Sequence, residues 1–587
     1  MIVGGRSFLA DASDETMPGM PSLEELQHWT WIIGRAQQMM LEAVSRSEGE
    51  DAGARPSFFV DPVRAAEVQN AFWSDGIRLW QRFLAPSAEE TPPGPADRDR
   101  RFAAPQWRDN PVFDLIRQSY VMLSDHLMGS VEAITGLDPR QRRQIRFVTQ
   151  LFADAMSPAN FPFTNPQVLE KTIETRGENL LKGLEHMLAD LAKGQLTQAD
   201  PKAFELGRNI AATPGKVIRE TPLYQLIQYA PSTETVFETP LVIFPPWINR
   251  YYILDLSPEK SFIRWAVEQG LTVFVVSWKS ADASLAEITA DDYVLRGQID
   301  AIDAVRDLLG VDGVHAIGYC VAGTTLAMTL ALLAARGEAD KVKSATFFTA
   351  QVDFSRAGDL NLFVDDEQMK LVSMLSGEAG YLDGRYMAAT FNLLRGRDLI
   401  WNYVVNNYLL GQDYPPFDLL HWNSDYTNLP ARWHQAYLTD LYRDNKLVRP
   451  GALSIAGTPI DLRRIATPSY IQAGREDHIA PAESVWELMH HLAGPRRFVL
   501  AGSGHIAGVV NPPAARKYQY WTSEGNHRSL DEFIADAKEV AGSWWPDWIR
   551  WIEGQASARV AAEGARIPGN GAFPAIEDAP GRYVRMR

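Results

Sequence analysis

The most informative stretch of this sequence is His315-Ala-Ile-Gly318-Tyr319-Cys320-Val321-Ala322-Gly323. An apolar run typical of a strand leads into a Gly-x-Cys-x-Ala-Gly turn, and a second apolar run that predicts a helix follows it. So sharp a turn needs small residues two positions before and two positions after its centre, and Gly318 and Ala322 meet that need. The pattern predicts a nucleophile elbow at Cys320, formed by the turn residues Gly318, Ala322 and Gly323.

Cys320 is the only cysteine among the 587 residues, so an intrachain disulfide and a thiolate metal cluster are excluded. A cysteine at the start of a helix meets the positive end of the helix dipole, which favours the thiolate. The backbone N–H of Val321 is then free to bind an oxyanion. A small buried hydrophobic residue in a strand-to-helix turn is the alternative interpretation. The spacing favours the nucleophile.

Strand and helix patterns alternate on both sides of the elbow from about residue 215 onward. The strand-like runs lie at residues 240–244, 271–276, 314–317, 345–349, 469–472 and 497–500. Helical patterns, such as those at 292–309 and 324–333, separate them. This alternation predicts parallel βαβ units in a doubly wound sheet. Together with the elbow, it predicts an α/β-hydrolase fold over residues 206–587.

A cysteine nucleophile needs a base, and the base needs an acid to orient it. In this fold the three residues follow in the order nucleophile, acid, histidine. Asp477 lies in a glycine-led turn after the run at 469–472, and His505 lies in a glycine-rich loop after the run at 497–500. We therefore predict that Cys320, Asp477 and His505 form a catalytic triad.

Other residues compete for two of these roles. His478 and Glu476 flank Asp477, and Asp477 itself is also typical of a turn or a helix cap. His490 and His491 lie on a helical pattern that favours a solvated face. The second oxyanion donor of such folds comes from the loop after an early strand, which here contains Trp247 and Ile248. We expect the backbone N–H of Ile248 or of Trp247 to take that role.

The first part of the chain has a different pattern, which predicts an all-helical N-terminal domain over residues 1–205. Trp73, Ile77, Trp80 and Leu84 follow one another at helical spacing after Asp61-Pro62. Trp29, Trp31, Trp73 and Trp80 are candidates for contacts with a surface, a partner or a second copy of the chain, or for the core of a self-contained bundle.

An aromatic insert at about 355–450 interrupts the strand–helix alternation. It is equally consistent with a cap over an active site and with a helical subdomain that has its own core. Its aromatic residues include Tyr381, Tyr386, Trp401, Tyr403, Tyr408, Tyr414, Trp422 and Trp433. A tryptophan-rich stretch near the end, Trp544 to Trp551, fits either an aromatic surface that rests on an interface or core packing, and core packing is favoured. The segment after Gln555 is expected to fray.

Charge and hydropathy exclude several classes of protein. The chain has 57 lysine and arginine residues and 73 aspartate and glutamate residues, for a formal net charge of −16. Such an acidic chain is a poor candidate for nucleic-acid binding. The longest apolar run, Leu326 to Ala335, is too short to span a bilayer, and the first twenty residues lack the apolar core of a signal peptide. We expect a cytoplasmic protein with no nucleic-acid partner and no transmembrane segment.

Several motifs resemble those of the polyhydroxyalkanoate synthases, most of all the class I enzymes that make poly(3-hydroxybutyrate). The matching strings are QWRDNPVFDLIRQSY, SPANFPFTNP, GRNIAATPGKVIRETPLYQLIQYAP, PPWINRYYILDL, VVSWKSADAS, GYCVAGTTLA, HWNSDYTNLP, GREDHIAP and GSGHIAGVVNPP. The family's catalytic cysteine, aspartate and histidine fall on Cys320, Asp477 and His505. The family's elbow usually has glycine at the position of Ala322. The additional methyl group of the alanine tightens the turn.

The resemblance implies transfer of (R)-3-hydroxyacyl groups from coenzyme A to the hydroxyl end of a growing polyester, with short monomers such as 3-hydroxybutyrate favoured. It also implies a homodimer on polymer granules in the cytoplasm, with possible granule-associated partner proteins, and neither a metal nor a tightly bound cofactor. Trp422, Asn423 and Asp425 would lie near the cap or a subunit contact. The competing hypotheses are a thioesterase or intracellular depolymerase of the same fold, and a non-catalytic granule-associated protein.

Overall fold

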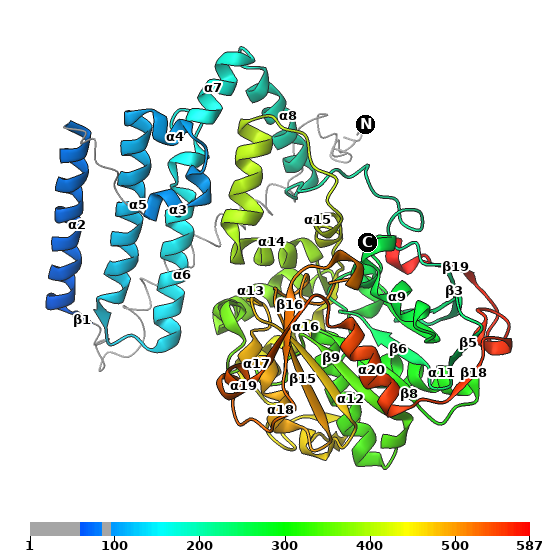
Figure 1. Ribbon diagram of the computed structural model, residues 1–587. Helices are drawn as coiled ribbons and strands as arrows, with labels where there is room; N and C mark the ends of the chain where they lie inside the picture. The colour runs from blue at the N-terminus through cyan, green and yellow to red at the C-terminus, as the bar shows by residue number, and fades with distance from the viewer. Residues whose placement is uncertain (1–58, 85–94) are drawn as a thin grey trace, which may run out of the picture. The chain divides into compact units, whose positions relative to one another are not determined.

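The computed structural model describes residues 59–84 and 95–587, which fold into two compact units (Figure 1). The helical unit contains the described residues up to Gln198 together with Ala389–Pro415. The sheet unit contains Ala199–Ala388 and Pro416–Arg587. The segment Ala389–Pro415 falls inside the insert predicted at 355–450 but folds with the helical unit.

The helical unit consists mainly of helices, as the sequence predicts. They are α2 (Pro62–Leu84), α3 (Pro95–Arg98), α4 (Gln106–Asp109), α5 (Pro111–Glu132), α6 (Pro139–Ala155), α7 (Pro166–Glu174) and α8 (Glu178–Lys193). Two-residue strands, β1 (Phe59–Val60) and β2 (Ile134–Thr135), also pair here. α5 begins at Pro111 because the side chain of Asn110 accepts a hydrogen bond from Val112 N at 2.9 Å and proline is favourable at the first helical position.

The segment Ala389–Pro415 packs closely against α8 inside the helical unit. It contains the end of α14 (Gly384–Leu394) and π-helical turns at Arg397–Trp401 and Val404–Leu409. A Cβ atom at Gly183 of α8 would lie 1.8 Å from the carbonyl oxygen of Tyr408, so only glycine allows this contact. The amide of Asn179 donates to the carbonyl oxygen of Leu409 at 2.8 Å.

The sheet unit is built on one large sheet of mixed direction. Its strand order is β17-β16-β15-β14-β9-β8-β6-β7-β4-β3-β19, and the run from β15 to β7 is parallel. The parallel strands are β6 (Leu241–Phe244), β7 (Val273–Trp278), β8 (Val314–Tyr319), β9 (Val342–Phe348), β14 (Ser469–Gly474) and β15 (Arg496–Ala501). Each coincides with a strand predicted from the sequence, which confirms the α/β fold.

The antiparallel flanks of the sheet are not predicted from the sequence. They are β3 (Gly215–Glu220), β4 (Tyr224–Tyr229) and β19 (Glu577–Asp578) on one side and β16 (Gln519–Thr522) and β17 (Lys538–Ala541) on the other. The expectation of a frayed segment after Gln555 is wrong, because β19 pairs with β3 and β18 (Arg559–Ala561) pairs with β5 (Thr235–Phe237).

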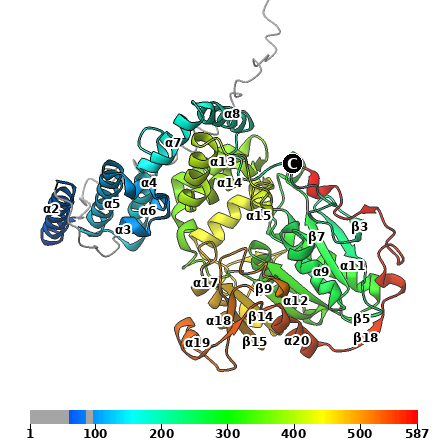
Figure 2. The same cartoon turned by 45° about the horizontal axis from the view of Figure 1, so that its top comes forward.

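Helices cover the sheet in the manner of a doubly wound fold, and Figure 2 shows α9 (Phe262–Glu268), α11 (Asp300–Leu309) and α12 (Val321–Arg336) grouped around its strands. α9 packs with α20 (Trp545–Gln555), where Phe262 contacts Trp545 and Trp548. Trp548 Nε1 donates to Thr346 Oγ1 of β9 at 3.0 Å. Trp544, Trp545 and Trp548 are completely buried, so the core-packing interpretation of this cluster is confirmed.

Shorter elements complete the sheet unit. The helices are α10 (Ala290–Asp292), α13 (Asp366–Gly377), α15 (Asp418–Asn423), α16 (Ala431–Ala436), α17 (Ala482–Trp486), α18 (Leu488–His491) and α19 (Leu530–Asp536). The two-stranded pairs are β10 (Tyr381–Leu382) with β11 (Leu429–Pro430) and β12 (Ser454–Ile455) with β13 (Thr458–Pro459). Across the described ranges, 59–84 and 95–587, no helix combines the length and apolarity needed to cross a bilayer.

Candidate active site

Cys320 is the single residue between β8 and α12. Its backbone has φ 53° and ψ −125°, a conformation that costs a non-glycine residue about 1–3 kcal/mol. Its N–H donates to the carbonyl oxygen of Phe348 at 2.9 Å, and its own carbonyl accepts from Gly323 N at 2.9 Å. These bonds on both sides of the residue hold the turn in the strained form, with the thiol at the carboxyl end of the strand.

The small residues of the elbow are required by close backbone approach. A Cβ atom at Gly318 would lie 2.5 Å from Gly323 Cα, and one at Gly323 would lie 2.4 Å from Ala350 Cβ. Ala322 is completely buried, so the turn accommodates its methyl group. The amide of Gln298, itself completely buried, donates to the Ala322 carbonyl oxygen at 3.0 Å and ties the first turn of α12 to the neighbouring helical segment.

Asp477 and His505 meet at the same edge of the sheet. β14 and β15 are parallel neighbours with Gly474 opposite Ala501, so the loops that follow them start side by side. His505 Nδ1 lies 2.7 Å from Asp477 Oδ2. Asp477 Oδ1 accepts from the backbone N–H groups of Ile479 at 2.8 Å and of Ala480 at 2.9 Å. The carboxylate is therefore fixed, with one oxygen directed at the imidazole.

The imidazole of His505 also lies close enough to the Cys320 side chain for the two groups to interact electrostatically. Burial opposes protonation of the ring, but interactions with Asp477 and Cys320 outweigh it and raise the pKa of His505 well above its usual value. Because Asp477 occupies Nδ1, Nε2 is the nitrogen left for the sulfur. The structure thus brings together all three residues of the predicted triad.

The alternative residues do not enter this arrangement. The residue hydrogen-bonded to Asp477 Oδ2 is His505. His491 lies near Asp353, at 3.8 Å, away from the triad. The Tyr319 hydroxyl donates to the backbone carbonyl oxygen of His505 at 3.1 Å, which fastens the histidine loop to the strand that carries the nucleophile.

Both predicted oxyanion donors lie next to the nucleophile in the topology. Val321 is the first residue of α12, so its N–H has no acceptor within the helix. Phe244, the last residue of β6, is paired with Gly318 of β8, so the loop that contains Trp247 and Ile248 starts beside the elbow. Ile248 is half-buried and packs against the core.

Two tyrosines that the sequence does not single out, Tyr437 and Tyr442, lie close enough to Cys320 to interact with it electrostatically. Burial, with the nearby Tyr442 and Cys320, raises the pKa of Tyr437 well above its usual range. Burial, with Cys320 and Asp477, likewise raises the pKa of Tyr442. Both hydroxyls therefore stay protonated and can donate hydrogen bonds in the site. In the sequence, only their position in the aromatic insert points to a role in the site. That position does not distinguish them from tyrosines that merely pack in the core.

Tyr437 joins a larger aromatic cluster. Its ring centroid lies 5.2 Å from that of Trp247 and 5.5 Å from that of Trp433. The portion of the insert in the sheet unit thus places apolar side chains around the loop after β6. Other aromatic residues of the insert belong to the helical unit, among them Trp401, Tyr403, Tyr408 and Tyr414.

Trp422 and Asp425 contact the same loop from α15 and the residues after it. Trp422 Nε1 donates to the Arg250 carbonyl oxygen at 2.8 Å. The buried Arg250 guanidinium pairs with Asp425 at 3.3 Å and donates to the carbonyl oxygens of Tyr583 and Met586. These contacts hold the loop after β6 in place at Arg250, two positions after Ile248.

Comparison with known proteins assigns a family. A family model described as the poly-beta-hydroxybutyrate polymerase (PhaC) N-terminus matches residues 98–266, and a model of the alpha/beta hydrolase fold matches residues 240–512. The poly(3-hydroxyalkanoate) polymerase subunit PhaC of Rhizobium meliloti (strain 1021) is 47% identical over 534 residues, which cover 90% of this chain and 86% of that protein. The chain belongs to the poly(3-hydroxyalkanoate) polymerase family.

The comparisons also find a second polymerase and a solved hydrolase structure. The poly(3-hydroxyalkanoate) polymerase subunit PhaC of Cupriavidus necator is 45% identical over 533 residues, 90% of this chain and 89% of that protein. Among solved structures, a hydrolase from Pseudomonas aeruginosa PA01 has a TM-score of 0.30 and 16% identity over 51% of this chain and 95% of that chain. In this polymerase family member, the range matched by the hydrolase-fold model, 240–512, contains Cys320, Asp477 and His505.

Proposed function

We propose that this protein is an acyltransferase that polymerises (R)-3-hydroxyacyl groups, taken from coenzyme A thioesters, into a polyester. The observation that carries the proposal is the Asp477–His505 hydrogen bond close to Cys320 at an elbow, in a chain of the poly(3-hydroxyalkanoate) polymerase family. The names of the relatives, 47% and 45% identical to this chain, support the polymerase activity.

In the first step the monomer is loaded onto Cys320. His505 holds the proton of the thiol, and the thiolate attacks the thioester carbonyl. The N–H groups of Val321 and Ile248 stabilise the tetrahedral oxyanion. The C–S bond to coenzyme A breaks, and His505 protonates the leaving thiolate. One thioester replaces another, so this step is nearly balanced in free energy.

In the second step the polyester grows by one ester bond. His505 takes the proton of a 3-hydroxyl group, whose oxygen attacks the acyl-cysteine carbonyl. An oxoester forms, the C–S bond to Cys320 breaks, and the proton returns to the sulfur. An oxoester is more stable than a thioester, so this step runs downhill. A serine nucleophile would lose that free energy at the loading step.

Water must be kept from the acyl-cysteine, because hydrolysis would end the chain. The aromatic side chains of Trp247, Trp433, Tyr437 and Tyr442 form a largely buried wall around the nucleophile and the loop after β6. Because they limit access of water, they favour a hydroxyl acceptor that is part of the bound substrate.

Further properties follow from the resemblance of the sequence motifs. Short monomers such as 3-hydroxybutyrate are the favoured substrates, and no cofactor takes part. The active form is a homodimer on the surface of polyester granules in the cytoplasm, where granule-associated proteins are possible partners. Light scattering of the purified protein with and without substrate tests the dimer.

The function is tested by incubating the purified protein with (R)-3-hydroxybutyryl-coenzyme A and separating the products. We expect coenzyme A release, precipitating polyester and, by intact-protein mass spectrometry, an acyl group on the wild type that is absent from Cys320→Ala. Free 3-hydroxybutyrate without polymer would favour a thioesterase or depolymerase. No coenzyme A release would favour a non-catalytic granule protein.

A further inference from the structure

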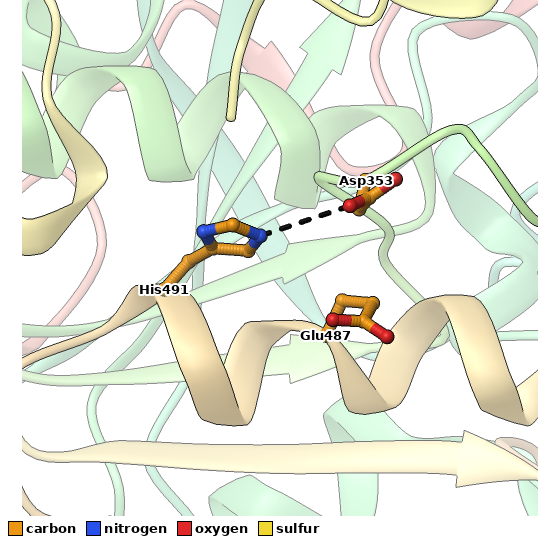
Figure 3. Close-up of side chains that lie close together, drawn as sticks. All are labelled: Asp353, Glu487 and His491. Carbon is orange, nitrogen blue, oxygen red and sulfur yellow. Dashed lines mark ion pairs between the residues drawn. The ribbon is translucent and has the colours of Figure 1, made fainter. Parts of the chain in front are cut away.

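A second group of reactive side chains lies apart from the triad, where Asp353, Glu487 and His491 face one another (Figure 3). One ligand atom from each side chain lies within 4.8 Å of the others. Asp353 is in the loop after β9, and Glu487 and His491 are one turn apart where α17 continues into α18. The three side chains therefore come from two separate parts of the chain.

The charge of this group is only partly balanced. The ion-pair partner of the Asp353 carboxylate in this group is the His491 imidazole, at 3.8 Å, and that imidazole is charged only when it is protonated. Within the described part of the chain, the carboxylate of Glu487 has no hydrogen-bond or salt-bridge partner. Two carboxylates and an imidazole held this close together would be stabilised by a bound cation.

The orientation of Asp353 is fixed before anything binds. Its Oδ1 atom accepts from Ser355 N and from Asn445 Nδ2, both at 2.9 Å. Its backbone carbonyl oxygen accepts from Ser484 Oγ at 2.5 Å. The remaining carboxylate oxygen, Oδ2, lies 3.8 Å from His491 Nε2, beyond hydrogen-bond distance. These contacts leave Oδ2 and Nε2 directed into the same space, as supporting contacts around metal ligands do.

We propose that Asp353, Glu487 and His491 bind a first-row divalent cation, with Zn²⁺ the best match. Imidazole and carboxylate together suit zinc, whereas magnesium and calcium prefer oxygen ligands alone. Donors about 2.1 Å from a tetrahedral zinc ion lie about 3.4 Å apart. The Asp353–His491 separation of 3.8 Å needs to shorten only slightly. Water would complete the coordination.

The cation would act as a brace on the wall of the active site. The loop that holds Asp353 also contains Gln351, whose carbonyl oxygen accepts from Thr324 Oγ1 of α12 at 2.7 Å. The Gln351 amide donates to the Tyr442 hydroxyl at 3.3 Å. Metal binding would fasten this loop to α17 and α18 and so restrict Thr324 and Tyr442. The proposal departs from the metal-free enzyme that the resemblance implies, and it does not depend on the polymerase activity.

The test measures zinc binding directly in the full-length chain. Cys320 and His505 also offer zinc ligands, so all proteins carry Cys320→Ala and are first stripped with a chelator that is then removed. Calorimetric titration with ZnCl₂ is expected to show one equivalent bound. Asp353→Asn, Glu487→Gln and His491→Gln should each weaken binding at least about tenfold, while His490→Gln on the same helix should bind as the parent does.

Two further readouts separate a ligand role from damage to the fold. Thermal unfolding should shift upward with added zinc in the parent and in His490→Gln, and not in Glu487→Gln, whose melting temperature without zinc should match the parent. Co²⁺ should give the visible bands of a nitrogen–oxygen site, and these should be lost in His491→Gln. Equal zinc affinity in Glu487→Gln and His490→Gln, or no binding in the micromolar range, would overturn the proposal.

Discussion

A single carboxylate controls the imidazole in this site. One oxygen of Asp477 accepts from two backbone N–H groups and the other meets His505 Nδ1. The sequence predicts this residue because it follows a buried strand in a glycine-led turn. It does not reveal the two hydrogen bonds that Asp477 accepts from the backbone N–H groups of Ile479 and Ala480. Backbone donors are present whatever the side chain, so residue identity does not indicate them.

Replacing Asp477 by asparagine should abolish most activity while preserving the fold. The amide can still accept from the backbone, but it neither stabilises the imidazolium nor enforces the tautomer with Nε2 toward Cys320. We expect kcat for coenzyme A release to fall about 10³-fold or more. The matched variant Glu476→Gln should stay within about twofold. Similar losses in both variants would show that the turn, not the carboxylate, matters.

The raised pKa of His505 predicts how stability depends on pH. In the wild type, interactions with Asp477 and Cys320 outweigh burial and hold the folded-state pKa of His505 above the unfolded value of about 6.5. The stabilising contribution is complete below that value and is lost as the pH rises through the folded-state pKa. The unfolding free energy from urea titrations should fall by up to about 1.4 kcal/mol per pH unit in that window. Cys320→Ala with Asp477→Asn should show a flatter profile, and parallel profiles would contradict the assignment.

At the scale of elements, the parallel strands could be predicted because each is a short apolar run buried on both faces. β3 and β4 could not, since Lys216, Arg219 and Gln225 interrupt their apolar residues. Nothing in the composition of Ala389–Pro415 separates it from the rest of the insert. What does separate it is the close backbone contact that Gly183 permits.

The packing of β8 against α12 makes Gly323 the most sensitive position of the elbow. The added Cβ of Gly323→Ala would meet Ala350 Cβ at 2.4 Å and the Gly318 carbonyl oxygen at 2.9 Å. We expect a loss of about 1–3 kcal/mol in unfolding free energy and a large loss of kcat. Adding Ala350→Gly should restore part of the stability but not the activity, because the backbone contact persists.

Gly377→Ala is the control for that pair of variants. This glycine is the last residue of α13, and a Cβ there would meet nothing within 4 Å. Its unfolding free energy should match or exceed that of the wild type. Full recovery of kcat in the double variant would show that the side-chain contact alone, and not the shape of the turn, limits the reaction.

On the scale of the whole molecule, distant parts of the sheet unit converge on the loop after β6. Arg250 connects Asp425, 175 positions away, with the carbonyl oxygens of Tyr583 and Met586 near the end of the chain. The sequence gives no sign of this connection, because it joins three segments of unrelated pattern. Together with the pairing of β18 and β19, it holds the terminal residues against the sheet unit where fraying was expected.

Arg250→Lys should therefore weaken both the fold and the reaction. Lysine keeps the charge but cannot reach the carboxylate and two carbonyl oxygens at once. We expect a loss of about 1–3 kcal/mol in unfolding free energy and a several-fold fall in kcat/KM for (R)-3-hydroxybutyryl-coenzyme A. Arg587→Ala, which removes an exposed partner of Asp425, should change neither. An unaltered kcat/KM in Arg250→Lys would show that the contacts of Arg250 do not affect the part of the loop after β6 that contains Ile248.

The positive φ of Cys320 has a practical use in trapping complexes. Glycine adopts this backbone conformation freely, so Cys320→Gly should tolerate heating better than Cys320→Ala although both lack sulfur. The glycine variant would then be the more stable protein for growing crystals and soaking them with unreacted thioester. Cys320→Ser keeps the backbone cost unchanged, so a comparison with the wild type would report the difference between sulfur and oxygen alone.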